Sequence, residues 1–296
     1  MNQTAREIKR EQFRQARLIH GGLWKFLVAV AGVKLARLWI PTQRLRLSLY
    51  RSVFGKKYPP GIDENDAEKP LWMYSSLNAL FTRAIKPEYR PIAFDAPTIL
   101  SPCDGTVQDV GRLNRDKLMT LKGIEYSLAS LLPMVDTSPF EDGHYAIIFL
   151  SPIDCHRVFS PHDGRLEQAI HVPGYRLPVH PPCQRAEYPV YSLNERMILR
   201  LSTPLGPCIV VMVAGWGVGN ITLPAAPNFK PRGKAKTCET WSKPVDVKRG
   251  DWIATFELGS TAVLITPPGL DVASLISPNQ KVKYGQPVLT YGGSQG

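Results

Sequence analysis

The chain has 296 residues, 44% of them hydrophobic and 21% charged, which is the balance of a globular protein with a full core and excludes an intrinsically disordered chain. An excess of Lys and Arg gives a formal net charge of +11, so we expect an anionic partner surface, either acidic phospholipid or nucleic acid, with solubility alone as the other explanation. Nucleic acid is the disfavoured partner, because no helix-turn-helix, zinc-knuckle or RNP-like pattern accompanies the charge.

The N-terminal 57 residues are predicted to form a basic, helical arm. Apolar residues recur in it at roughly helical spacing, at Trp24, Leu27, Ala31, Leu35 and Leu38. No uninterrupted run of the ~20 apolar residues needed to cross a bilayer is present, and no signal-peptide cleavage site follows. We therefore expect the arm to lie on a membrane surface. Packing of the same stripe on the protein's own core is the alternative, because the lysines do not segregate to one face.

Residues 58–70 join a Pro-Pro-Gly turn to an acidic run and are predicted to be a linker, which places a compact body at 71–296. A short helix is expected over 75–85, with Ser75 or Ser76 as its cap.

Short apolar runs rich in β-branched residues alternate with turn residues in the rest of the body. This pattern predicts antiparallel strands at 145–150, 197–201, 209–213, 252–256 and 262–265. The expected fold class is α+β, predominantly antiparallel β in a sandwich or barrel-like core, with an N-terminal helical membrane-associating arm.

The cysteines do not form a recognisable framework. They are spread without any Cys-x-x-Cys pair, at Cys103, Cys155, Cys183, Cys208 and Cys238. An odd number at this spacing predicts neither a set of disulfides nor a zinc site, and it fits a reducing compartment. We expect no metal.

Three segments carry groups that could act in catalysis. They are Ser-Pro-Cys-Asp-Gly-Thr-Val at 101–107, Leu-Ser-Pro-Ile-Asp-Cys-His-Arg-Val-Phe-Ser-Pro at 150–161 and Leu-Gly-Ser-Thr at 258–261. Each one alone is more often a turn or a structural residue. Together they offer a hydroxyl nucleophile, an imidazole base and a carboxylate, which is the set that activates a serine.

In this order the three segments resemble the signature segments of phosphatidylserine decarboxylases, pyruvoyl enzymes that convert phosphatidylserine to phosphatidylethanolamine. The resemblance extends from about residue 71 to residue 287. Further stretches that are similar to the family lie at 78–83, 90–92, 122–123, 126–128, 172–174, 194–196 and 218–221.

The resemblance implies that the chain cuts itself between Gly259 and Ser260, leaving a β chain of residues 1–259 and an α chain of residues 260–296 that stay associated. Ser260 would become a covalent pyruvoyl cofactor. This group would form a Schiff base with phosphatidylserine and release CO2, so pyridoxal phosphate is not needed.

The resemblance assigns catalytic roles to Asp104, His156 and Ser260, with His156 as base or acid and Asp104 as the carboxylate that orients it. Supporting or substrate-binding roles are expected for Tyr126, Arg157 and His162. The family usually carries a second histidine, in a His-Arg-x-His arrangement, where this chain has Phe159. This departure leaves open which imidazole serves which step, and whether the chain processes slowly or not at all.

The expected protein is therefore a self-processing phosphatidylserine decarboxylase, peripheral on the cytoplasmic side of the cell membrane and in contact with anionic lipid. The sequence does not decide whether the protein forms a homodimer, which acyl chains it prefers or which group donates the proton. Two alternatives remain: a pyruvoyl decarboxylase of a soluble amino acid, and a lipid-binding homologue that does not process.

Overall fold

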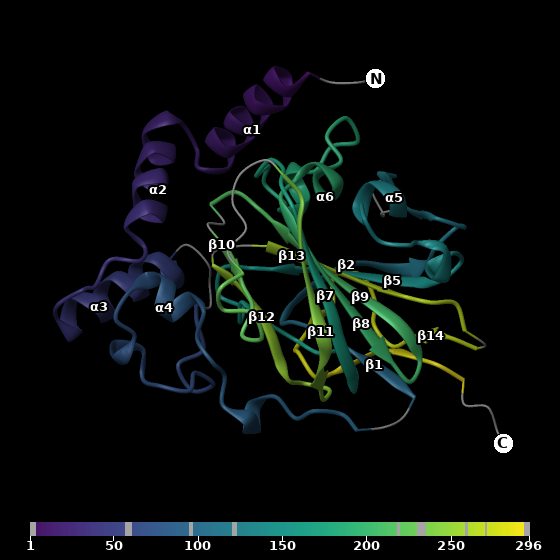
Figure 1. Cartoon of the computed structure of the whole chain (residues 1–296). Coiled ribbons are helices and arrows are strands. Elements are labelled where there is room, and N and C mark those ends of the chain that lie inside the picture. Colours follow the sequence, from purple (N-terminus) through teal and green to yellow (C-terminus); the bar gives the residue numbers. More distant parts are fainter. Residues whose placement is uncertain are drawn as a thin grey trace.

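The structure is a computed structural model that describes residues 4–56, 61–94, 97–119, 123–217, 220–229, 235–257, 260–269 and 271–292. Within these ranges the centre is an eight-stranded antiparallel sheet (Figure 1). Its strands, in spatial order, are β11 (Thr237–Val247), β7 (Gly164–Val172), β8 (Arg196–Thr203), β9 (Gly206–Ala214), β13 (Ser260–Thr266), β5 (His144–Leu150), β2 (Gly105–Arg112) and β15 (Lys281–Val282).

Smaller sheets accompany the central one in the described ranges. One has the order β10-β12-β6, from Asn220–Thr222, Trp252–Glu257 and Arg157–Phe159. A second has the order β1-β16-β14, from Thr98–Leu100, Pro287–Thr290 and Ala273–Ser274. A hairpin joins β3 (Lys117–Met119) to β4 (Glu125–Ser127).

Both faces of the central sheet are covered. Every residue of β13 is buried, and its alternate side chains enter two different cores, Ala262 on one face and Val263 on the other. The first core also holds side chains of the two three-stranded sheets, such as Phe256 of β12. The second is closed by α5 (Leu128–Leu131) and α6 (Val190–Leu193). Two-sided burial explains why these strands are continuous apolar runs.

The expected strands at 145–150, 197–201, 209–213, 252–256 and 262–265 are confirmed as β5, β8, β9, β12 and β13. The α+β class with mostly antiparallel sheet is confirmed as well.

The expected helix over 75–85 is present but shorter, as α4 (Leu77–Phe81). Ser76 is its cap and accepts a hydrogen bond from the Ala79 backbone at 3.1 Å. The chain leaves the helix after Phe81, and Ile85 then forms an isolated β-bridge with Ala67. Single-turn 3₁₀ helices lie at Leu71–Met73, Pro87–Tyr89, Ser138–Phe140 and Pro181–Cys183.

The arm is helical, as expected, and within residues 4–56 it contains α1 (Ala5–Ile19), α2 (Leu23–Leu35) and α3 (Gln43–Tyr50), with a π-helical turn at Arg51–Lys56. The break between α1 and α2 falls on Gly21 and Gly22, whose φ angles of 70° and 124° other residues rarely adopt. Within the described residues no single helix has the length and apolar content to cross a bilayer. Helices α1 and α2 have the required length and apolar content only when they are counted together, and the pair is bent by 99°.

Candidate active site

Two pairs of strands meet at one corner of the molecule. In the central sheet β13 pairs with β5, and Ser260 lies opposite Leu150. In the small sheet β12 pairs with β6, and the backbone N–H of Phe256 donates to the His156 carbonyl at 2.9 Å. In chain order β6 is the next strand after β5, and β13 is the next strand after β12. Since both connections join the same two sheets, Ser260 and His156 are brought to the same corner.

Ser260 is the first residue of β13 and is 0% exposed. Its Oγ has no hydrogen-bond partner among the described residues. Alternation along β13 places its side chain on the same face as Ala262, which is the face covered by the β6–β12 sheet. A buried hydroxyl without a partner is costly for a fold, and the same holds for Thr261 and Thr266 of this strand, so the missing partner leaves Ser260 Oγ available for chemistry without by itself marking a catalytic group. Gly259, the other half of the expected cleavage junction, lies outside the described residues.

His156 is 0% exposed and lies against the ring of Phe81, with ring centroids 3.6 Å apart. Its Nδ1 is 3.0 Å from the Asp154 carbonyl oxygen, which can only accept, so Nδ1 carries the proton. Nε2 then carries a lone pair, and it has no partner among the described residues. Burial lowers the pKa of His156 to about 3. The neutral imidazole therefore presents a free lone pair that can accept a proton.

The sequence did not single out Arg83, yet this residue shapes the imidazole's surroundings. It is buried and donates to the Ile153 carbonyl at 2.8 Å and to the Asp154 carbonyl at 3.4 Å. The same Asp154 carbonyl faces His156, so one cation fixes the loop that orients the base. Its charge also contributes to the low pKa of His156, after burial.

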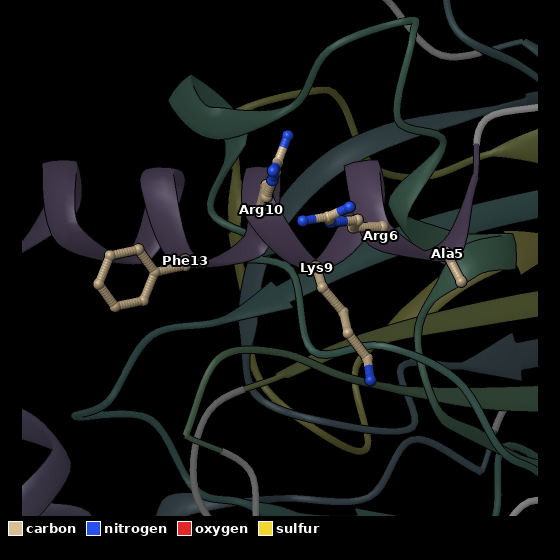
Figure 2. A pocket seen from close by; sticks show the side chains of 5 residues that line it. All are labelled: Ala5, Arg6, Lys9, Arg10 and Phe13. Atoms are coloured by element: carbon tan, nitrogen blue, oxygen red, sulfur yellow. The ribbon is translucent and has the colours of Figure 1, made fainter.

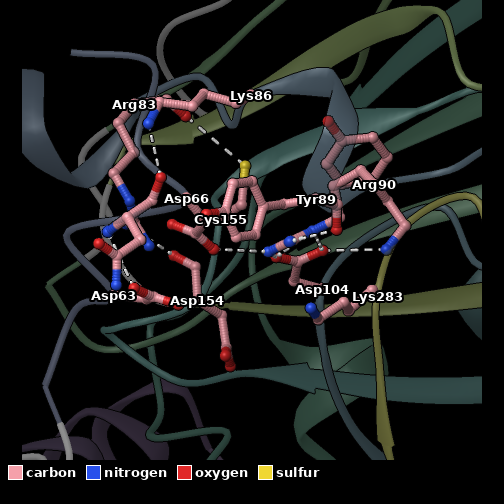
Figure 3. A network of polar contacts seen from close by, with 12 residues as sticks. Asp63, Asp66, Arg83, Lys86, Tyr89, Arg90, Asp104, Asp154, Cys155 and Lys283 are labelled. Carbon is pink, nitrogen blue, oxygen red and sulfur yellow. Dashed lines mark hydrogen bonds and ion pairs between the residues drawn. The ribbon is translucent and has the colours of Figure 1, made fainter.

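Among the described residues, no hydrogen bond joins Asp104 to His156. Its carboxylate accepts from Arg90, Nε at 3.0 Å and Nη2 at 2.5 Å, and from the backbone N–H of Tyr284 at 2.9 Å. Arg90 also pairs with the buried Asp66 at 3.1 Å (Figure 3). Burial alone would lower the pKa of Arg90, but the two carboxylates outweigh it and raise that pKa. The expected orienting role is therefore filled by a backbone carbonyl, and Asp104 holds a buried ion-pair network.

Asp154 contributes a carboxyl group to the same loop. Its Oδ2 accepts from the Ser151 N–H at 2.7 Å, and its Oδ1 lies 3.7 Å from Lys281. Burial raises the pKa of Asp154. Arg157, for which a supporting or substrate-binding role is expected, donates to the Thr82 carbonyl at 3.1 Å and lies over the ring of Trp252.

The remaining expected residues lie elsewhere. His162 follows the other end of β6, with Nε2 3.1 Å from Arg249 and Nδ1 3.0 Å from the Asp163 carbonyl. Tyr126 is buried in the core on the opposite face of the central sheet, where its ring stacks on Tyr191. Neither residue is brought to the corner that holds Ser260.

Phe159 occupies the position of the family's second histidine. Its ring stacks on Tyr284 at 3.6 Å with an interplanar angle of 13°. Both rings belong to a small apolar cluster with Ile85 and Cys155. This position is therefore filled by packing and supplies no proton-transfer group.

Comparisons with known proteins identify the relatives of this site. A family model described as phosphatidylserine decarboxylase matches residues 77–290, a stretch that includes Asp104, His156 and Ser260. The phosphatidylserine decarboxylase proenzyme of Halorhodospira halophila is 40% identical over 212 residues, 71% of this chain and 72% of the relative. The proenzyme of Anaeromyxobacter sp. (strain K) is 33% identical over 255 residues, 84% of this chain and 89% of the relative. That of Polaromonas sp. is 32% identical over 275 residues, 90% and 94% of the two chains.

Proposed function

The chain belongs to the phosphatidylserine decarboxylase family, and from this premise we propose that it is a proenzyme that cuts itself at Gly259-Ser260 and then converts phosphatidylserine to phosphatidylethanolamine and CO2. One observation carries the proposal. The buried, unpartnered Oγ of Ser260 lies at the same corner as a neutral imidazole whose Nε2 is also unpartnered among the described residues.

Self-cleavage uses these two groups in sequence. His156 Nε2 takes the proton from Ser260 Oγ, which attacks the Gly259 carbonyl carbon and replaces the peptide bond by an ester. The former peptide nitrogen of residue 260 takes up the proton from His156 and becomes a free amine. A base then removes the Cα proton of residue 260 as the bond between Cβ and the ester oxygen breaks, which releases Gly259 as a carboxylate. Water converts the dehydroalanine left at residue 260 to a pyruvoyl group and releases ammonia.

The surroundings of residue 260 fit such a group. Ser260 Oγ has no hydrogen bond to lose when the hydroxyl is removed, and the backbone of the residue is paired on both sides, with Leu150 and with Ala214. The pyruvoyl carbonyl supplies an acceptor for the electrons left when the substrate carboxylate departs. In the same corner, His156 is our proposed proton donor and acceptor.

The two products would stay together because strands of the α chain are paired with strands of the β chain. After the cut, β13 would remain paired with β5 and β9, β15 with β2, and β16 with β1. Each of these partners lies before residue 259. The new terminus at residue 260 is therefore held in the central sheet.

We propose further that the arm lies on anionic lipid, on the cytoplasmic side of the cell membrane. Trp24 is 80% exposed and Trp39 is 67% exposed, and aromatic side chains of this kind suit the headgroup level of a bilayer. An open pocket along α1 adds cations beside apolar groups, since it is lined by Ala5, Arg6, Lys9, Arg10 and Phe13 (Figure 2). A soluble amino acid would need no such surface.

The test is the intact mass of the purified protein together with its activity. The 33.0 kDa chain should give two pieces that separate before residue 260, and Ser260→Ala should stay whole. Turnover of phosphatidylserine in vesicles with none of free serine would support the lipid substrate. Wild-type protein that remains permanently whole would support instead a lipid-binding homologue, and gain of cleavage in Phe159→His would then trace the defect to the missing imidazole at residue 159.

A further inference from the structure

The N-terminal arm contacts the strand that leads into the cleavage junction. Arg37, two residues beyond the end of α2, forms an ion pair with Glu257, and its Nε donates to Glu257 Oε2 at 3.0 Å. These two residues are 220 positions apart in the chain. Glu257 is the last residue of β12 and lies three positions before Ser260.

A second contact reaches the neighbouring strand end. The ring of Trp216 lies 4.4 Å from that of His20 and 5.9 Å from that of Phe26, measured between centroids. Trp216 comes two residues after Ala214, the residue of β9 that pairs with Ser260. In β10, Asn220 pairs with Glu257 itself. The arm therefore contacts the end of β12, just before the nucleophile in the chain, and the segment that follows β9, the strand paired with Ser260.

Self-cleavage requires this backbone to be placed accurately. The Oγ of Ser260 must approach the carbonyl carbon of the preceding residue at close to attack distance, and small displacements cost large factors in rate. That residue is a glycine, which restrains its own backbone least of all residues. The orientation of the scissile carbonyl must then be set by the residues around it.

We propose that Arg37 and Glu257 are a positioning pair, through which the arm holds the cleavage segment for attack by Ser260. The inference rests on the proposed function. The side chain of Glu257 is 18% exposed and that of Arg37 is 53% exposed, so water screens the pair only partly. Arg37 acts through Glu257 and touches no reacting atom.

The experiment follows conversion of the full-length chain into its two pieces, by denaturing gel and intact mass. Arg37→Ala and Glu257→Gln should each slow self-cleavage by about fivefold, the upper range for a partly exposed ion pair. The double variant Arg37→Glu with Glu257→Arg should recover most of the wild-type rate. Arg51→Ala is the matched control, because it removes another exposed ion pair of the arm, Arg51 with Glu64 at 3.4 Å, and should leave the rate unchanged.

Three results would overturn the inference. The first is cleavage of Arg37→Ala or Glu257→Gln at the wild-type rate. The second is slow cleavage of the exchanged double variant although its melting temperature matches that of wild type. Third, a fully processed Arg37→Ala enzyme could show a lowered kcat/KM, which would assign Arg37 to the substrate instead of to processing. A wild-type chain that never cleaves would refute the proposed function itself, so the two failures are distinguishable.

Discussion

The two ends of β6 each carry a buried histidine, and the two differ in how their ring nitrogens are used. His162, after the strand, has Nε2 beside Arg249 and Nδ1 beside the Asp163 carbonyl. His156, before the strand, has one nitrogen at the Asp154 carbonyl and the other without a partner among the described residues. Both histidines are buried, but of the two only His156 keeps a ring-nitrogen lone pair that is available for proton transfer.

The largest expected effect comes from removing this lone pair. His156→Gln should slow self-cleavage by about 10²-fold to 10⁴-fold, the range over which general bases contribute. The amount of uncut chain over time, measured by intact mass, checks this. His162→Gln is the matched control and should cleave as wild type does. Equal losses in the two variants would contradict the division of roles.

Asp104→Asn tests the ion-pair network that the structure shows in place of a contact with His156. Removing the charge leaves the buried Arg90 with Asp66 alone, and we expect a loss of about 3–5 kcal/mol in the free energy of unfolding. Urea denaturation of the uncut Ser260→Ala background measures it. A loss of cleavage much larger than the lost stability explains, at a temperature where the variant is folded, would show instead that Asp104 acts directly in the chemistry.

His162→Ala should affect stability and leave cleavage unchanged. The substitution removes one partner of the buried Arg249, whose Nε stays paired with Asp163 at 3.0 Å. We expect a loss of about 1–3 kcal/mol in the free energy of unfolding, the cost of a buried donor left without its acceptor. Thermal melting measures it, and a wild-type melting temperature would show that the Arg249 contact is not stabilising.

The smallest effect concerns pH. Since the pKa of folded His156 is about 3, its base form persists through neutral and mildly acidic pH, and the cleavage rate should not fall near pH 6.5. The unfolded chain takes up a proton at this residue near pH 6.5, so its contribution to stability is complete above that pH and is lost as the pH falls toward about 3. Unfolding of Ser260→Ala with and without His156→Gln, compared from pH 7 to pH 4, isolates this contribution. Identical pH dependence in the two proteins would contradict the low pKa.

Local patterns in the sequence were enough to predict the strands. The apolar runs that became β5, β9 and β13 carry their information in neighbouring residues, because burial on both faces demands continuous β-branched sequence. The cap at Ser76 is equally local. The order of the three motif segments was enough to indicate the family, which the comparisons then established.

Contacts between distant segments were decided only by the tertiary structure. The sequence suggested a carboxylate for His156, whereas the fold places a backbone carbonyl there and gives Asp104 to Arg90. It gave no sign that Arg37 would meet Glu257, 220 positions away. Periodicity and turn chemistry act over a few residues, so they determine which elements form. The partner of a buried charge depends on how those elements pack, because a desolvated group pairs with whatever the assembled fold brings within reach.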